Sequence, residues 1–252
     1  MSVTAAHANH RAFWRQFARI CGGESLETPG GLLVRSGIPG RSWNQLHLDP
    51  GERQEPALER ALNYFEGHGL PWRLYAETES AATNRFAARH GATLQPLYPV
   101  LTRPGGRIDD AGDGDLMMSD AVDVAGLRAF LGCAAAVYGF EPDLLAPLVN
   151  DRAFADLAFR FHLGRVGDRV AAVSISVRHD NSVGVYFVGV RGEYRRRGFG
   201  RIITARAIGA VPEASVAVLQ ATGAGLPVYR RMGFTTVAEY RYWNFAAPGS
   251  PS

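Results

Sequence analysis

The chain alternates between segments with helical hydrophobic spacing and short apolar segments typical of strands. In the first half the pattern predicts helices at 5–20, 56–67 and 80–90, and strands at 32–35, 45–48, 72–76 and 93–102. In the second half it predicts helices at 122–138, 141–149, 198–210 and 226–232, and strands at 158–166, 170–178, 183–190, 215–220 and 235–245. Because some strands follow each other in hairpins and others are reached through helices, an α/β fold with a mixed sheet is expected.

A stretch rich in Gly, Pro and Asp interrupts this pattern at 103–115. Such composition is typical of a linker. We therefore predict two domains, at 1–104 and 116–245, with a linker at 105–115 and a tail at 246–252.

The two halves also resemble each other. The segment around Gly51 is similar to that around Gly192, and the segment around Gly91 is similar to that around Gly233, at offsets of 141 and 142 residues. A nearly constant, domain-sized offset favours two related domains in tandem.

Composition narrows the class of protein. With 252 residues, 46% hydrophobic and 20% charged, the chain has enough apolar surface for a sizeable core, which excludes disordered and collagen-like chains. Cys21 and Cys133 are far apart and lie in no metal-binding pattern, so we expect buried thiols, no metal and no disulfide. Apolar stretches are too short to span a bilayer, and no secretion signal is evident, so a cytoplasmic protein without membrane contact is expected.

The net charge of +3 is too small to predict a nucleic-acid partner. The chain contains no lysine, so its 27 basic residues are all arginines. Three of them, Arg195, Arg196 and Arg197, stand together after the predicted strand 183–190. Gly198 and Gly200 then open a helix, whose first N–H groups lack partners at the positive end of the helix dipole. This combination predicts a phosphate or pyrophosphate site.

The spacing Arg195-x-x-Gly198-x-Gly200 is weak evidence by itself, since Gln220, Gly223 and Gly225 show the same spacing. Only the first segment has positive charge and a long helix after it. The missing lysine excludes a Walker loop, and the arginine in place of the first glycine departs from the Rossmann fingerprint.

Residues 116–245 resemble the GCN5-related N-acetyltransferase (GNAT) family, on this loop and on a second motif, Tyr229-Arg230-Arg231-Met232-Gly233-Phe234. The resemblance implies the acyl-CoA N-acyltransferase fold and acetyl-CoA as cosubstrate, with the loop holding its pyrophosphate. It also implies that Tyr229 is catalytic and protonates the departing CoA thiolate. The cosubstrate-binding residues implied in this way are Val188, Val190, Arg195, Arg196, Arg197, Gly198, Phe199 and Gly200.

The resemblance implies a glutamate base near Gly184, but the strand 183–190 contains no acidic residue. His162, His179, Asp180 and Glu193 are candidate bases, although each is more often a strand-end or surface residue. The acceptor, a small-molecule or peptide amine, and the oligomeric state stay undetermined.

The first half is expected to be the same fold without the site. The offset places Gln54, Ala57 and Glu59 where the second half has Arg195, Gly198 and Gly200, and Ala87 where it has Tyr229. Glu52, Glu55 and Glu59 would surround the corresponding position with negative charge, which opposes phosphate binding.

The leading hypothesis is therefore an acetyl-CoA-dependent N-acetyltransferase with one active domain. A protein that binds CoA or an acyl-CoA without turnover is the alternative, because no base is evident. RNA or phosphate binding through the arginines is a third hypothesis, which the lack of an aromatic stacking surface disfavours.

Overall fold

A computed structural model describes residues 3–108 and 115–249 and divides the chain into two compact units. Unit 1 comprises residues 1–13 and 100–237, and unit 2 comprises residues 14–99 and 238–252. Helix α1 (Val3–Ile20) and strand β12 (Thr235–Phe245) contribute residues to both units. Part of the predicted linker, residues 109–114, lies outside the described residues. The predicted domain ranges do not coincide with the compact units, and as boundaries of two related copies they stay a prediction.

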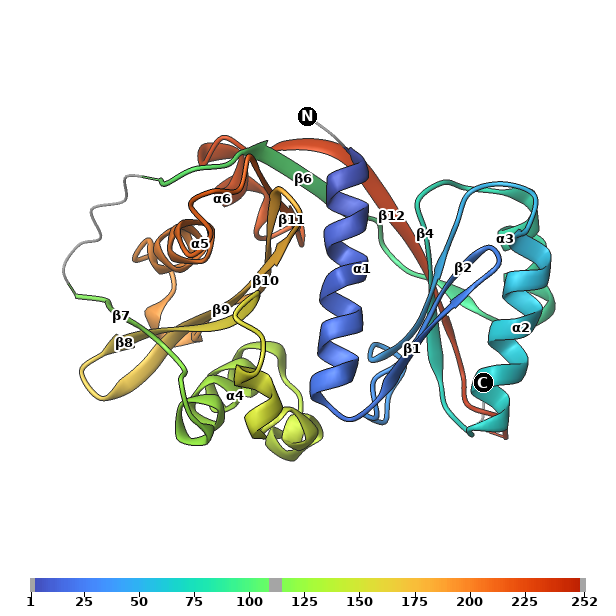
Figure 1. The fold of residues 1–252 in the computed structure, drawn as a ribbon, viewed down its shortest axis with the longest axis horizontal. Helices are drawn as coiled ribbons and strands as arrows, with labels where there is room; N and C mark the ends of the chain where they lie inside the picture. The colour runs from blue at the N-terminus through green and yellow to red at the C-terminus, as the bar shows by residue number, and fades with distance from the viewer. Residues whose placement is uncertain (1–2, 109–114, 250–252) are drawn as a thin grey trace. The chain divides into compact units, whose positions relative to one another are not determined.

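Unit 2 contains a mixed sheet with the strand order β1-β2-β3-β4-β12, in which β5 also pairs with β12. Only β3 and β4 pair in parallel. Helices α2 and α3 lie on one face of this sheet (Figure 1) and bury Leu46, Phe65, Trp72 and Phe245 in a shared core. The elements are β1 (Glu24–Thr28), β2 (Gly31–Arg35), β3 (Asn44–Leu48), α2 (Gln54–Gly67), β4 (Trp72–Ala76), α3 (Ala81–Arg89) and β5 (Thr93–Leu94).

Unit 1 contains the sheet β6-β11-β10-β9-β8-β7, and only β10 and β11 pair in parallel. Helices α4 and α5 cover opposite faces of this sheet (Figure 1). The strands are β6 (Tyr98–Pro104), β7 (Met117–Asp120), β8 (Phe159–Val166), β9 (Arg169–His179), β10 (Ser182–Val190) and β11 (Val216–Gln220). The helices are α4 (Val124–Tyr138), η1 (Pro142–Leu148), η2 (Asp151–Phe154), η3 (Gly192–Tyr194), α5 (Phe199–Gly209) and α6 (Leu226–Arg231).

The two units repeat one pairing scheme. The order β1-β2-β3-β4-β12 and the order β8-β9-β10-β11-β6 both run antiparallel, antiparallel, parallel, antiparallel. Helices α3 and α6 also end alike, since Gly91 and Gly233 both adopt positive φ and the next N–H returns to the carbonyl of Ala87 or Tyr229. In each unit the last strand comes from the other half of the sequence, since β12 completes unit 2 and β6 completes unit 1.

Most predicted elements are confirmed, with three differences. The edge strands β1 and β7 were not predicted, because β1 carries exposed polar residues and β7 has only four residues. The strand expected at 93–102 is two strands, β5 and β6. The helix expected at 141–149 is the 3₁₀ segment η1, which contains Pro147 and a kink at Leu145. Cys21 and Cys133 are both buried, as predicted.

In unit 1 the first part of α1 is tied to the sheet by one fully buried amide, that of Asn9. Its Nδ2 donates to the carbonyl of Val177 at 3.1 Å and to Oγ of Ser182 at 2.8 Å, and its Oδ1 accepts from the Tyr186 hydroxyl at 2.7 Å. This amide occupies the space that a side chain at Gly184 would fill. Glycine at 184 is therefore required for α1 to pack here.

We expect Gly184→Ala to lower the free energy of unfolding by about 1–3 kcal/mol, because the new methyl group overlaps the Asn9 amide. Asn9→Ala should also destabilise, by about 1–3 kcal/mol, because it leaves buried polar partners unsatisfied. Since the alanine at 9 removes the overlap with the amide and leaves only that with the Tyr186 ring, the double variant should lose less than the sum of the two. Urea unfolding of the four proteins measures this coupling, and strictly additive losses would contradict the assigned contact.

Candidate functional site

The loop predicted to bind phosphate lies between β10 and α5 in unit 1. Gly198 is the N-cap of α5 and adopts φ 79°, a conformation that favours glycine. Among the residues that the structure describes, no side chain caps this helix end. The N–H groups of Arg201 and Ile202 both donate to the Gly198 carbonyl. An uncapped N-terminus on a long helix leaves backbone donors directed at the loop, where an anion can accept from them.

Gly200 differs from Gly198, because its backbone does not require glycine. A Cβ at position 200 would find Val190 Cγ2 at 3.8 Å as its nearest neighbour, which is an ordinary contact. The protein itself thus leaves room beside Gly200. A ligand that approaches the backbone closely gives a reason for glycine at this position.

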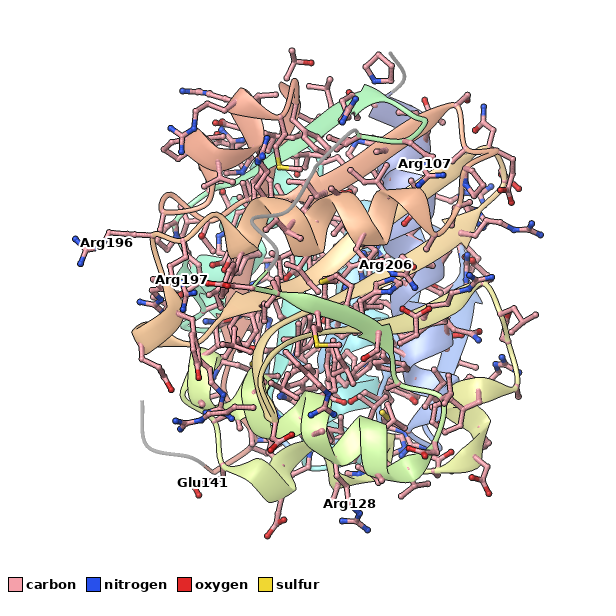
Figure 2. All side chains as sticks on the ribbon, turned by 90° about the vertical axis from the view of Figure 1, so that its left-hand side faces the viewer. Arg107, Arg128, Glu141, Arg196, Arg197 and Arg206 are labelled. Carbon is pink, nitrogen blue, oxygen red and sulfur yellow. The ribbon has the colours of Figure 1, made fainter. Side chains whose placement is uncertain are left out.

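The three arginines of the loop have different surroundings. Arg195 is exposed and its Nε donates to the Val190 carbonyl at 3.3 Å. Arg196 adopts φ 64° and points away from the fold (Figure 2). Arg197 donates from Nη2 to Asp115 at 2.7 Å and lies over the Phe199 ring, 4.8 Å from its centroid. An anion would compete with Asp115 for Arg197, whereas the guanidinium of Arg196 extends into solvent.

The remaining predicted residues take part mainly through their backbones. The Phe199 side chain is 1% exposed in a core with Leu116 and Ile203, so only its main chain is directed to the loop. Val188 and Val190 lie near the end of β10 with half-buried side chains. The Val188 carbonyl accepts a hydrogen bond from the Tyr138 hydroxyl at 3.0 Å.

The ladder between β10 and β11 ends before the loop. Their parallel pairing runs from Ser182 and Val216 to Val185 and Leu219, while β10 continues to Val190. A register irregularity against β9 follows at Tyr186 and Gly189. The backbone of β10 beyond Val185 is thus outside the ladder with β11, and such groups need other partners.

The equivalent strands of unit 2 do not separate. Pairing of β3 with β4 continues to Leu48 and Ala76, the last residues of both strands. At the start of α2, Ala57 is buried and the Gln54 side chain donates to the Asp49 carbonyl. The position equivalent to the loop is therefore closed by the protein's own side chains.

The acidic residues of α2 have a different role from the one expected. Glu55 pairs with Arg85 at 2.8 Å and Glu59 pairs with Arg89 at 3.4 Å, so both link α2 to α3 on the surface. Ala87, which stands where unit 1 has Tyr229, is buried in the unit 2 core.

Tyr229 lies on α6 and is 8% exposed, with its ring packed against Phe234. Its hydroxyl is hydrogen-bonded to Thr204, whose own hydroxyl donates to the Gly200 carbonyl at 2.8 Å. Burial raises the pKa of Tyr229 to about 12, an effect that Thr204 only partly opposes. Tyr229 therefore keeps its proton well beyond neutral pH.

Of the four candidate bases, His162 is fully buried in a network under α5. Its Nδ1 and the Asp120 carboxylate are 2.8 Å apart, and its Nε2 lies 2.9 Å from the Ser176 hydroxyl. Arg206, which is labelled in Figure 2, donates from Nη2 to both Asp120 oxygens at 3.0 Å. An Asp, His and Ser in this order resemble a nucleophilic triad, but Ser176 is 1% exposed and a substrate cannot reach it. The network connects α5 with three strands.

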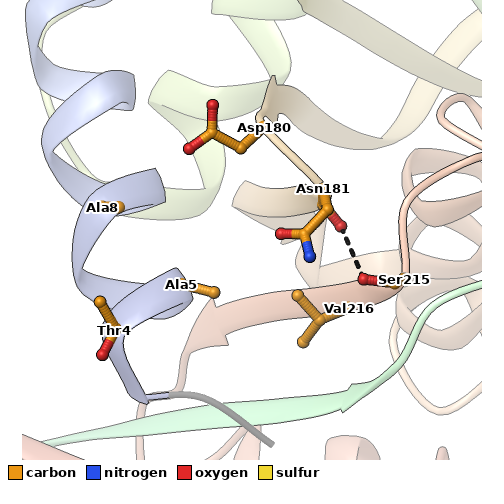
Figure 3. Close-up of a pocket in the computed structure, with 7 residues that line it drawn as sticks. All are labelled: Thr4, Ala5, Ala8, Asp180, Asn181, Ser215 and Val216. Carbon is orange, nitrogen blue, oxygen red and sulfur yellow. Dashed lines mark hydrogen bonds between the residues drawn. The ribbon is translucent and has the colours of Figure 1, made fainter.

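The other candidate bases lie elsewhere. His179 and Asp180 are at the turn that precedes β10, 3.7 Å apart. This turn borders a pocket of about 400 Å³ at the end of β10 opposite the loop (Figure 3). Glu193 follows β10 and pairs with Arg169 at 3.4 Å. In the described part of the chain no cluster of three or more His, Cys, Asp or Glu side chains is arranged to hold a metal.

Sequence reasoning missed Asn9, Tyr138 and Phe187 near the separated strands. Phe187 adopts φ 51°, which is unusual for a bulky residue. The glycine at 184 was a signal for a close approach of another segment, but a single sequence does not indicate which segment approaches.

The Asp120 network predicts a pH-dependent stability. Burial alone would raise the pKa of Asp120, but His162 and Arg206 outweigh it and lower the pKa from 3.8 to about 2. Burial lowers the pKa of His162, so the imidazole stays neutral at pH 7. A lowered folded-state pKa means that the stabilisation by ionised Asp120 is complete above pH 3.8 and is lost as the pH falls towards 2.

We therefore expect Asp120→Asn to lower the free energy of unfolding at pH 7 by about 1–3 kcal/mol, with a difference that shrinks below pH 4. Denaturant unfolding from pH 2 to pH 8 measures it. Glu213→Gln is the matched control, since the Arg178–Glu213 pair is 57% and 58% exposed, and an ion pair in solvent contributes little to stability. A constant difference across the whole pH range would show that the charge of Asp120 is unimportant.

Comparison with known proteins agrees with this geometry. Residues 108–231, just under half of the chain, match the family model described as "Acetyltransferase (GNAT) domain". This segment includes β10, the loop, α5 and all of α6 with Tyr229. A search of curated proteins finds no match. The part of the chain that the structure describes has no helix long and apolar enough to span a membrane.

Solved structures share the fold at low sequence identity. A GCN5-related N-acetyltransferase from Kribbella flavida has a TM-score of 0.68 at 17% identity, with 93% of this chain and 96% of that chain covered. One from Sphaerobacter thermophilus has a TM-score of 0.62 at 14% identity, with 100% and 96% covered. A "tandem GNAT protein from the clavulanic acid biosynthesis pathway" has a TM-score of 0.55 at 13% identity, with 88% and 80% covered. The chain thus has a mixed α/β fold of GNAT type, which supports acyl transfer in general.

Proposed function

We propose that the chain is an acetyl-CoA-dependent N-acetyltransferase that uses one cosubstrate site, in unit 1, and acetylates a primary amine. The observation that carries this proposal is the separation of β10 from β11 directly before an uncapped, arginine-rich helix N-terminus. A long ligand with a phosphate group at one end and an amide-containing arm fits both features. The phosphates accept from the α5 N–H groups and the arginines, and the arm pairs with the exposed backbone of β10.

The residues present fit such a ligand. The space beside Gly200 allows close approach of a pyrophosphate, and Arg196 contributes positive charge from solvent. Val188 and Val190 contribute backbone groups, and Arg195, Arg197, Gly198 and the main chain of Phe199 complete the site. In unit 2 the parallel strands stay paired to their ends, which supports a single site per chain.

Tyr229 is the proposed acid. With a pKa of about 12, its phenol is protonated throughout the physiological range, but it is a weaker acid than a thiol with a pKa of roughly 8.5. Complete proton transfer to a CoA thiolate is therefore uphill. A hydrogen bond donated to the thiolate, which stabilises the charge as the thioester breaks, suits this phenol better.

We also propose that the two halves are related copies and that the first is degenerate. The repeated pairing scheme and the similar ends of α3 and α6 support this relation.

The alternative function, CoA or acyl-CoA binding without turnover, has one observation in its favour. The position where a base is expected is Gly184, and the Asn9 amide fills the adjacent space. An amide does not take up a proton at neutral pH. Release of CoA thiol from acetyl-CoA across a panel of amines, compared with binding of CoA alone, discriminates the two functions.

The loop assignment is tested by placing the same residue at both ends of α5. Gly200→Glu puts a carboxylate beside the proposed phosphate position and should weaken CoA binding at least about tenfold, the effect of roughly 1.4 kcal/mol. Gly209→Glu is the control, since a Cβ there meets no neighbour within 4 Å and the residue lies at the other end of the helix. Calorimetry should find one CoA per chain in the wild type and near-normal affinity in Gly209→Glu. Equal affinities of the two folded variants would refute the assigned loop.

The role of Tyr229 is tested by Tyr229→Phe, which keeps the buried ring. We expect the chemical rate to fall about 10- to 10³-fold while CoA affinity changes little. Because the pKa is about 12, the wild-type rate should show no decline from Tyr229 ionisation up to pH 10. Single-turnover kinetics with an accepted amine measure the step. A wild-type rate in the variant, with chemistry rate-limiting, would make Tyr229 a packing residue.

A further inference from the structure

Strand β10 is distorted where it leaves β11. Its pairing with β9 is irregular between Tyr186 and Gly189, and Phe187 within this bulge adopts φ 51°. A bulky residue in the left-handed region is strained, and such a conformation persists only where the surroundings hold it. The structure must therefore contain contacts that fix the bulge.

The contact on the α4 side comes from Tyr138, the last residue of α4. Its hydroxyl donates to the Val188 carbonyl at 3.0 Å. Its ring packs edge-on against Phe187, with centroids 5.7 Å apart, and is stacked with Phe140 at 6.4 Å. These two ring contacts restrict the rotation of the Tyr138 side chain. They therefore keep its hydroxyl directed at the Val188 carbonyl.

The end of α4 is itself fixed against β10. Gly139 terminates the helix with φ 71°, and its N–H donates to the Ala135 carbonyl. A Cβ at Gly189 would lie 3.1 Å from the Val137 side chain, so helix and strand are in close contact at this point. Arg191 bonds to carbonyls of both Gly132 in α4 and Val170 in β9. Tyr138 thus acts from a rigid support.

We propose that Tyr138 is a positioning residue, whose hydroxyl orients the bulged backbone of β10 for the arm of the cosubstrate. The inference rests on the proposed function. Because a peptide unit is planar, a hydrogen bond to the Val188 carbonyl also fixes the direction of the Gly189 N–H. The direction of the Gly189 N–H in turn influences the orientation of the Val190 backbone, the next residue along the strand. Tyr138 acts on the arm-binding backbone and not on the phosphate loop.

Because Tyr138 acts on the arm-binding backbone and not on the phosphate loop, two ligands that differ in the arm test its role. Calorimetry compares CoA with adenosine 3′,5′-bisphosphate, which carries the nucleotide phosphates but no pantetheine arm. In Tyr138→Phe, CoA should bind about two- to tenfold more weakly, the range of one neutral hydrogen bond, while the bisphosphate binds as in the wild type. The KM for acetyl-CoA should rise by a similar factor with kcat little changed. Tyr138 is 47% exposed, so the variant is expected to fold, which thermal unfolding checks.

Tyr186→Phe is the matched control, since it removes a hydroxyl from the same strand on the other side of the bulge, where the partner is Asn9. It should lower stability without changing the ratio of the two affinities. Unchanged CoA affinity in Tyr138→Phe, an equal loss for both ligands, or the same loss in Tyr186→Phe would each overturn the inference. If the wild type binds neither ligand, the proposed function fails first, and this result is distinct from the others.

Discussion

The hydrogen bonding of β10 is the constraint on which the candidate site depends. A central strand normally pairs on both sides, but β10 pairs with β11 only as far as Val185. Beyond that residue its backbone must be satisfied by β9, by side chains such as Tyr138, or by a ligand. Three features therefore belong together: the end of the β10–β11 ladder, the distorted residue Phe187 and the start of α5. In each of them, backbone polar groups are available to hydrogen-bond a bound molecule.

The surrounding packing keeps these three features in place. On one face, α5 is connected to the sheet by Arg206 and Asp120 as well as by its apolar core. On the other face, the end of α4 contacts β10 at Gly189, and the Asn9 amide lies against Gly184. Glycine at 184 and 189 thus serves close packing, whereas glycine at 200 serves no contact within the protein. The same residue type has two physical roles within one strand-loop-helix segment.

Local signals explain what could be predicted from the sequence. Apolar runs of four to nine residues identified the buried strands, and the run of arginines and glycines after β10 identified the loop, because both depend on neighbours in the chain. The bulge at Phe187, the hydroxyl of Tyr138 and the Asn9 amide could not be predicted, since each depends on a partner 50 to 177 residues away. The pKa of Tyr229 is likewise raised because its side chain is buried, and the amino-acid composition does not indicate that burial. The edge strands β1 and β7 were missed because exposed, polar strands have weak patterns.

The exchange of last strands between the two halves has a consequence for biosynthesis. During translation, β11 finds its partner β6 already made, more than a hundred residues earlier. Strand β4 has the opposite situation, because its partner in β12, residues 241–245, is made more than a hundred residues later. The first half of the chain therefore has an open sheet edge at β4 until β12 has been synthesised. Neither half of the sequence contains all the strands of one sheet. Expression of either half alone would therefore leave a sheet with an unpaired edge strand.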